Sequence, residues 1–370
     1  MNTVGFTLYV LKFDDPITGM GTLTILLMVP WVLFGPFAGV LVDRWSKRSV
    51  IIVCDVARGA LSAVLPFVAN QAGFFLVIVL LALLDVLFSP AISGFLPAVV
   101  PKDALVMAGS LYAASGQVAL LVGPAVGGLL VATLGFNSVF LINGLAFVIA
   151  SVFSVAITQK GKALRTAAPE QSKFFSEMRD GASYARDHRT VFFVIVFFGL
   201  ASMVFGALPI LLPNYLTGVL AVTDRQYGFF VSVSGLGALA GALLVPRIHK
   251  RFSSITVMVV GVGAYGLLMS VLTVFSFIGY TMGIYFFVGI MVSVTNVSYG
   301  VYLQRVVDEK YIGRVFSLDL TLGSLMTLIA MIAVTWLARA EDIILWIVSL
   351  GALLVVLALV GLTVSRRVSQ

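Results

Sequence analysis

Four ionisable side chains, Asp55, Arg58, Asp85 and Asp319, stand inside long apolar stretches of the sequence. A charge at membrane depth costs at least about 2.5–3.5 kcal/mol on insertion scales, so each needs a partner or a water-filled cavity. Asp55 and Arg58 are three residues apart, on one helix face, where they can pair. The rise per helical residue places Arg58 roughly 12 Å and Asp85 roughly 18 Å from the inner boundary of their spans. An arginine side chain can reach across this difference in depth if the two helices touch. The pattern predicts that Asp85, alone or with Arg58, binds and releases a proton, with Asp55 as a further candidate. The alternative is a static ion pair that fixes packing.

Asp319 differs from the other three because it lies about one turn inside its apolar stretch, near Arg314. A charge so close to the end of a helix is less costly than one at its centre. We therefore expect Asp319 to have a structural role rather than a coupling role.

The composition indicates the environment of these charges. Of the 370 residues, 60% are hydrophobic and 11% are charged, and the mean hydropathy is +1.11. An ordinary soluble domain is about 45–50% apolar and about 25% charged, so the polar residues here are too few to coat a soluble fold. A soluble enzyme, a nucleic-acid-binding protein and a disordered protein are excluded. The single cysteine, Cys54, excludes a disulfide framework and a Cys-based metal site.

Eleven apolar stretches are long enough to cross a bilayer as helices, for which roughly 20 residues are needed. Residues 1–13 are apolar but too short, and they lack the basic start and cleavage site of a signal peptide. We interpret them as the outer end of a first helix whose beginning is missing. The sequence predicts an all-α membrane protein with eleven full spans and this remnant. The spans are 17–42, 50–69, 74–97, 104–133, 136–158, 190–213, 226–246, 254–275, 279–303, 315–338 and 343–364.

One long polar interval, 159–189, divides the chain into an N-terminal bundle, 1–158, and a C-terminal bundle, 190–370. A basic run repeats between the halves, because 44–48 and 247–251 carry Arg and Lys at the same spacing. Such duplicated halves are common in secondary transporters. Inside the interval, apolar residues recur at helical spacing and predict an amphipathic helix on the membrane surface; a solvated linker is the alternative for 160–172. These apolar residues are Phe174, Phe175, Met178, Ala182 and Ala185.

The distribution of basic residues predicts the orientation. Most of the 23 Lys and Arg residues fall in loops on the same side of the membrane as the polar interval 159–189. Only Lys12, Arg225 and Arg339 fall on the opposite side. Lys and Arg stay in the cytoplasm, so the interval and the C-terminus are expected there. The net charge of +7 is then explained by loops that face anionic lipid, and no nucleic-acid partner is expected.

The most specific motif is the segment 39–48, which reads GVLVDRWSKR. Gly39 permits close helix approach, and Asp43 at the end of the second span can cap a neighbouring helix N-terminus. Arg44, Lys47 and Arg48 can pair with carboxylates on adjacent helices. The alternative is a short basic turn that only sets the topology.

This segment resembles the loop signature of the major facilitator superfamily, G-x-x-x-D-R-x-x-K/R-K/R. Further stretches resemble its bacterial branch of enterobactin-exporter and macrolide-efflux-like proteins. The resemblance implies twelve helices in two six-helix bundles, a central cavity, alternating access, a monomer and a bacterial inner-membrane location. The sequence departs from the pattern in its short first helix, at Ala98 after Pro97, and at Pro246 where Asp43 would repeat. The similar stretches are 88–97, 123–128, 179–189 and 313–318.

A second motif lies in the fifth span, where Gly123, Pro124, Gly127 and Gly128 occur together. Proline inside a helix removes a backbone hydrogen bond and kinks it, and glycines admit a close neighbour. The segment resembles the superfamily's antiporter motif, found mainly in exporters, although Ala119 stands where that motif has another glycine. Generic packing of small residues is the alternative.

These features favour a proton-driven secondary exporter of small amphipathic molecules. No phosphate-binding loop of ATPases is present, no cofactor or metal is expected, and the GxGxxG at 261–266 lies inside an apolar span, where it serves packing. A lipid or lysolipid translocator and a non-transporting membrane assembly or sensor protein are the alternatives. Each polar residue that can line the substrate cavity can equally form an interhelical hydrogen bond. The cavity candidates are Trp31, Gln117, Asn214, Asn296 and Tyr299.

Overall fold

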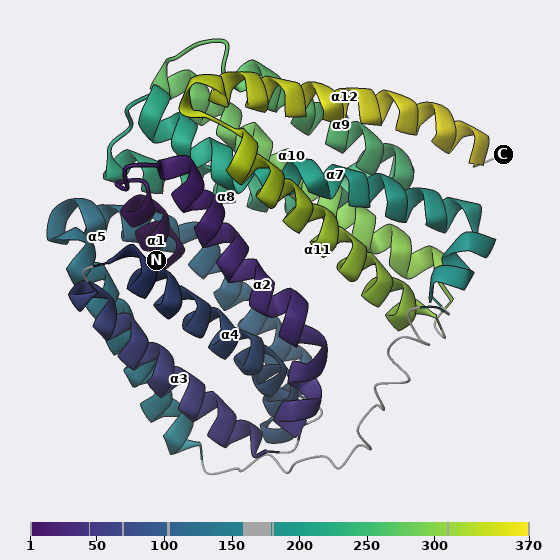
Figure 1. Cartoon of the computed structure of the whole chain (residues 1–370). Coiled ribbons are helices and arrows are strands. Elements are labelled where there is room, and N and C mark those ends of the chain that lie inside the picture. Colours follow the sequence, from purple (N-terminus) through teal and green to yellow (C-terminus); the bar gives the residue numbers. More distant parts are fainter. Residues whose placement is uncertain are drawn as a thin grey trace. The chain divides into compact units, whose positions relative to one another are not determined.

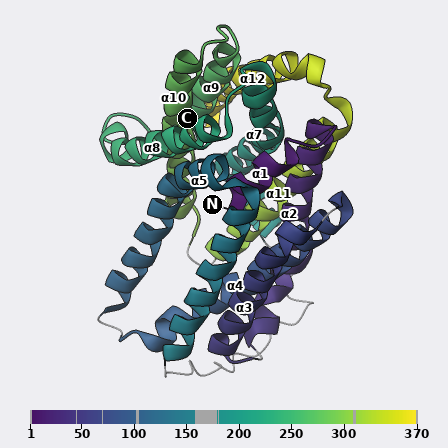
Figure 2. The same ribbon diagram turned by 90° about the vertical axis from the view of Figure 1, so that its left-hand side faces the viewer.

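The computed structural model describes residues 2–43, 45–68, 70–101, 104–157, 179, 181–308 and 311–368, and no strand occurs in these ranges. The helices are shown in Figure 1 and, from another side, in Figure 2. They are α1 (Asn2–Val10), α2 (Pro16–Asp43), α3 (Lys47–Val64), η1 (Leu65–Phe67), α4 (Gln71–Val99), α5 (Leu105–Ala156), α7 (Arg189–Asn214), η3 (Tyr215–Val219), α8 (Asp224–Ile248), α9 (Ser254–Leu272), α10 (Ile278–Val306), α11 (Ile312–Leu337), η4 (Ala340–Asp342) and α12 (Ile343–Val368).

Within these ranges, 10 helices are long and apolar enough to cross a membrane, one fewer than expected. The difference lies in α5, a helix of 52 residues that contains both expected spans 104–133 and 136–158. The two parts meet at a kink without a connecting loop. Gly135 forms the kink with φ 77° and ψ 171°, a positive φ that glycine adopts at little steric cost.

The chain divides into two compact units. Unit 1 is Met1–Phe13 with Thr22–Pro169, and unit 2 is Asp14–Gly21 with Glu170–Gln370. The first turns of α2 therefore pack with the second half of the sequence. At Gly21 a Cβ would come within 2.5 Å of Thr335 Cγ2, so this packing requires a residue without a side chain.

In unit 1, α3 packs against both α4 and α5, and α3 and α4 lie side by side in both views (Figure 1, Figure 2). Gly59 and Gly144 allow the α3–α5 contact, because a Cβ on Gly144 would lie 2.9 Å from the Gly59 carbonyl oxygen. The short α1 is held by aromatic rings of α4 and α5. Phe6 lies 6.0 Å from Phe74, centroid to centroid, and 5.7 Å from Phe140.

In unit 2, α8 packs along α10, α9 along α12, and α7 along α11. Figures 1 and 2 both show α9 beside α12. Close contacts between helices are again made at glycines. At Gly206 of α7, a Cβ would lie 2.7 Å from the Thr327 carbonyl oxygen of α11. Small residues at helix crossings are typical of membrane proteins, because helices in lipid associate through packing of their backbones.

Candidate functional site

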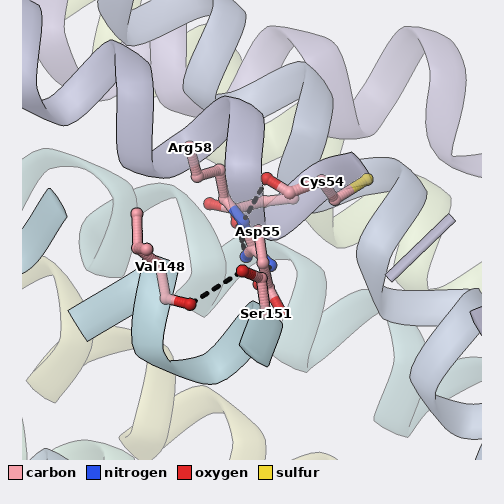
Figure 3. A network of polar contacts seen from close by, with 6 residues as sticks. Cys54, Asp55, Arg58, Val148 and Ser151 are labelled. Carbon is pink, nitrogen blue, oxygen red and sulfur yellow. Dashed lines mark hydrogen bonds and ion pairs between the residues drawn. The ribbon is translucent and has the colours of Figure 1, made fainter. Parts of the chain in front are cut away.

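The predicted pairing of Arg58 with both aspartates is confirmed in unit 1. Arg58 Nη2 donates to Asp55 Oδ1 at 2.6 Å, and Nη1 donates to Asp85 Oδ1 of α4 at 2.7 Å. Arg58 Nε donates to the Cys54 carbonyl oxygen one turn earlier in α3, at 3.3 Å. Figure 3 shows this network together with Ser151 and Val148 of α5, which lie beside it.

Aromatic rings fix the position of the Arg58 guanidinium. The ring of Phe88 in α4 lies 4.0 Å from the guanidinium carbon and the ring of Phe147 in α5 lies 4.7 Å from it, centroid to atom. A cation over an aromatic face is stabilised by the ring quadrupole, more so when desolvated. The close α3–α5 crossing at Gly59 brings Phe147 into this position. Arg58 is therefore a rigid, buried centre of charge shared by three helices.

The two aspartates differ in accessibility. The side chains of Asp55 and Arg58 are 5% and 6% exposed, whereas that of Asp85 is 48% exposed. One guanidinium faces two carboxylates, so the group carries one excess negative charge when both are ionised. Of the two carboxylates, that of Asp85 is the one at the surface of unit 1.

The basic motif 39–48 makes different contacts from those expected. Arg48 Nε donates to the Ser154 carbonyl oxygen at 3.2 Å, and its Nη2 donates to that of Val155, so it caps the C-terminus of α5. Among the described residues, Arg48 therefore contacts backbone carbonyls and not the expected carboxylate, because free carbonyls at a helix C-terminus also attract a cation. Lys47 is buried against Gly94 of α4.

The other residues of the segment 39–48 include Gly39 and the cap of α3. Among the described residues, no atom lies within 4 Å of a Cβ placed on Gly39, so a close helix approach at this glycine stays a prediction. The cap of α3 is Ser46, whose hydroxyl accepts from the Ser49 amide. Arg44 and the side chain of Asp43 lie outside the described residues.

The antiporter-like motif lies in the first part of α5. Gly127 and Gly128 are buried and Gly123 and Pro124 are half-buried. The backbone stays helical around Pro124, and the interruption in α5 occurs at Gly135 instead. Burial of both glycines is what close packing of a neighbour requires.

The cavity candidates are distributed over both units, with Trp31 and Gln117 in unit 1 and the other three in unit 2. Trp31 is 46% exposed. Asn296 is exposed and Asn214 is buried, and both donate to carbonyl oxygens of their own helices, at 2.8 Å to Val292 and 2.7 Å to Ile210. These two amides are thus satisfied within their helices and not between helices. Tyr299 is buried and binds Asp319, and the side chain of Gln117 lies outside the described residues.

A polar contact that the sequence did not reveal joins α8 and α10. His249 follows α8, and its Nε2 lies 2.8 Å from Ser298 Oγ, which is fully buried. His249 is therefore held by a buried hydroxyl of the neighbouring helix. Burial lowers the pKa of His249 below its ordinary value, and the charge of Arg305 lowers the pKa further.

This pKa shift predicts a pH-dependent stability of unit 2. The folded state disfavours protonated His249. The contribution of neutral His249 to the free energy of unfolding is therefore fully present above about pH 6.5, the ordinary histidine pKa, and is lost as the pH falls below that value. We expect the melting temperature of the purified protein, followed by tryptophan fluorescence, to fall between pH 7.5 and 5.5. His249→Gln should reduce this fall. An equal fall in both proteins would show that His249 does not contribute.

The fold and the charged network define a class of protein, namely multi-pass helical membrane proteins with ion-paired carboxylates inside their spans. The sequence model of the Major Facilitator Superfamily matches residues 2–331, so the chain belongs to this superfamily of transporters. It is therefore a multi-pass membrane transporter that acts on small molecules, and it is not an enzyme.

Two bacterial efflux proteins are similar in sequence to this chain. The chain is 26% identical over 352 residues to macrolide efflux protein A of Streptococcus pyogenes, covering 91% of this chain and 85% of the relative. It is 29% identical over 249 residues to the multidrug efflux pump Tap of Mycobacterium bovis, covering 62% of this chain and 58% of the relative. These identities are modest but extend over most of the chain in the first case.

Solved structures agree on the fold. The nucleoside transporter NupG matches with a TM-score of 0.73 at 16% identity, covering 98% of this chain and 93% of NupG. A bacterial homologue of the iron transporter ferroportin, in an inward-facing state, matches with a TM-score of 0.72 at 16% identity, covering 97% and 93% of the two chains. The shared architecture is therefore that of major facilitator transporters.

Proposed function

We propose that this protein is a proton-coupled exporter of small amphipathic molecules in the bacterial cytoplasmic membrane. It works by alternating access of two helical bundles, 1–158 and 190–370, joined by the cytoplasmic segment 159–189. The substrate class is suggested by the efflux relatives, whose names describe macrolide and multidrug export. The distribution of basic residues supports a C-terminus in the cytoplasm.

The observation that carries the proton coupling is the single guanidinium between two carboxylates of unequal exposure. With both carboxylates ionised, the group holds an unbalanced negative charge in a span, which is costly. A proton on Asp85 removes that imbalance. Asp85 therefore serves as the proton-binding group, and Arg58 and Asp55 hold it in position.

Asp85→Asn tests this proposal. Asparagine keeps the side chain's shape and can accept the Arg58 hydrogen bond through its oxygen, but it cannot exchange a proton. In proteoliposomes with an imposed pH gradient, the unmodified protein should accumulate erythromycin, a macrolide. Accumulation by the variant should fall to the level seen without a gradient, while counterflow of labelled against unlabelled erythromycin continues.

Two further measurements decide the outcome. Asp85→Glu should retain gradient-driven accumulation, because it retains the carboxyl group. The melting temperature of Asp85→Asn shows whether the variant is folded. If folded Asp85→Asn keeps the pH dependence of the unmodified protein, Asp85 has no part in coupling.

A further inference from the structure

A second carboxylate lies in a candidate span of unit 2. Asp319 is in α11, in the candidate span Arg314–Leu337, about 7–8 Å along the axis from the start of that span. The hydroxyl of Tyr299 in α10 donates to Asp319 Oδ1. The Tyr299 ring is stacked on Phe198 of α7, with centroids 3.9 Å apart and an angle of 8°. Three helices thus contribute a carboxylate and two parallel rings.

The carboxylate of Asp319 differs from those of Asp55 and Asp85 in its charged neighbours. Among the described residues, no Lys, Arg or His forms an ion pair with Asp319, in contrast to Asp55 and Asp85. Arg314, which was expected nearby, has its guanidinium 5.6 Å from the Tyr311 ring centroid. An unbalanced charge in a span is costly, so a cation that reaches Asp319 is strongly favoured. Asp319 and Phe198 are only half-buried, and both are accessible to a solute.

Among the described residues, several aromatic rings extend from the Asp319 contact along α7 and α9. Phe198 is followed along α7 by Phe205, with ring centroids 6.3 Å apart, and Phe205 lies 5.0 Å from Tyr265 of α9. Ser202, between these phenylalanines, accepts through its carbonyl oxygen from Thr327 Oγ1 of α11. Aromatic faces attract organic cations, and a neighbouring carboxylate adds a charge-assisted bond. Such a set is suited to an amphipathic cation whose apolar body lies along the rings.

We propose that Asp319, with Tyr299 and Phe198, binds the cationic amine of amphipathic substrates. The Tyr299 hydroxyl holds one carboxylate oxygen, and no other described side chain occupies the second. The inference rests on the proposed export of small amphipathic molecules and names the charge class of those molecules. It assigns Asp319 to substrate recognition, separately from the proton-binding group around Arg58.

The test is binding of rhodamine 6G, a lipophilic cation with a secondary amine, to the purified full chain, followed by fluorescence polarisation. Asp319→Asn is the informative variant, because the asparagine oxygen still accepts from Tyr299 while the charge is lost. We expect it to weaken binding about tenfold or more, as the loss of a charged contact does. Asp319→Glu should retain most of the affinity. Glu341→Gln, an exposed charge removed at η4, is the matched control and should bind normally.

Phe198→Ala provides a second route, since it removes the ring platform without touching the Tyr299–Asp319 bond. It should weaken binding several-fold, in line with a cation–π contribution. Unchanged affinity in folded Asp319→Asn, or no binding of rhodamine 6G by the unmodified protein, overturns the inference. Neither result affects erythromycin transport by the same preparation, which tests the proposed function independently.

Discussion

Arg58→Gln should destabilise the protein by about 3–5 kcal/mol, as expected when one partner of a buried ion pair is removed. The substitution removes both ion pairs and the bond to the Cys54 carbonyl, and it removes the cation between Phe88 and Phe147. Asp55, whose side chain is 5% exposed, then has no positive partner. The chain itself supplies the probe, because its single cysteine, Cys54, is buried beside this network. A thiol-reactive fluorophore therefore reports thermal unfolding.

Two further variants separate charge from packing. Arg58→Gln combined with Asp55→Asn should recover part of the lost stability, because no unpaired buried charge remains. Arg58→Lys should recover little, since an ammonium is a point charge without the planar fork that contacts both carboxylates. If the double variant melts no higher than Arg58→Gln alone, the loss comes from packing around the rings and not from uncompensated charge.

The charged network could be predicted from the sequence because membrane depth restricts what an ionisable residue can do. Asp55 and Arg58 share a helix face by spacing alone, and Asp85 was placed by counting residues from the ends of its stretch. The difference in side-chain exposure between Asp55 and Asp85 could not be predicted in this way. Their exposures of 5% and 48% depend on how α3, α4 and α5 pack. The Gly59–Gly144 contact that sets this packing links residues far apart in sequence.

The contacts of Arg48, His249 and Asp319 could not be predicted for a related reason. Arg48 binds carbonyl oxygens of Ser154 and Val155, which every residue carries, so no residue type marks the partner. Ser298 and Tyr299 are adjacent in α10, and they serve His249 and Asp319 respectively. Which neighbour each of them contacts depends on the rotation of α10 about its axis. An apolar helix with no clear polar face leaves that rotation undetermined at the level of sequence.

The helix boundaries followed largely from hydropathy, and the main error concerned α5. The expected break between 133 and 136 is present, but it is a kink at Gly135 and not a loop. The sequence offers a glycine there without polar turn residues around it, so either a short turn or a kink was possible. Hydropathy locates spans well because each span must bury its backbone polar groups in a helix.

Gly289→Ala should be among the most damaging of the glycine substitutions in unit 2. A Cβ on Gly289 of α10 would lie 1.9 Å from the Ser234 carbonyl oxygen of α8, and one on Gly237 of α8 would lie 1.9 Å from that of Phe286. Backbone atoms cannot rotate away as a side chain does, so the two helices must separate along their contact. Overpacking typically costs about 1–3 kcal/mol and occasionally more, and we expect about 3 kcal/mol here.

Gly283→Ala on the same helix is the matched control. It is exposed, and no atom lies within 4 Å of a Cβ placed there. Alanine at an open helical position is favoured over glycine by about 1 kcal/mol, so Gly283→Ala should melt at or above the temperature of the unmodified protein. Gly289→Ala should melt well below it in the same Cys54 thiol assay. Because both variants add one methyl group to α10, equal melting temperatures would mean that α8 and α10 do not approach this closely in the folded protein.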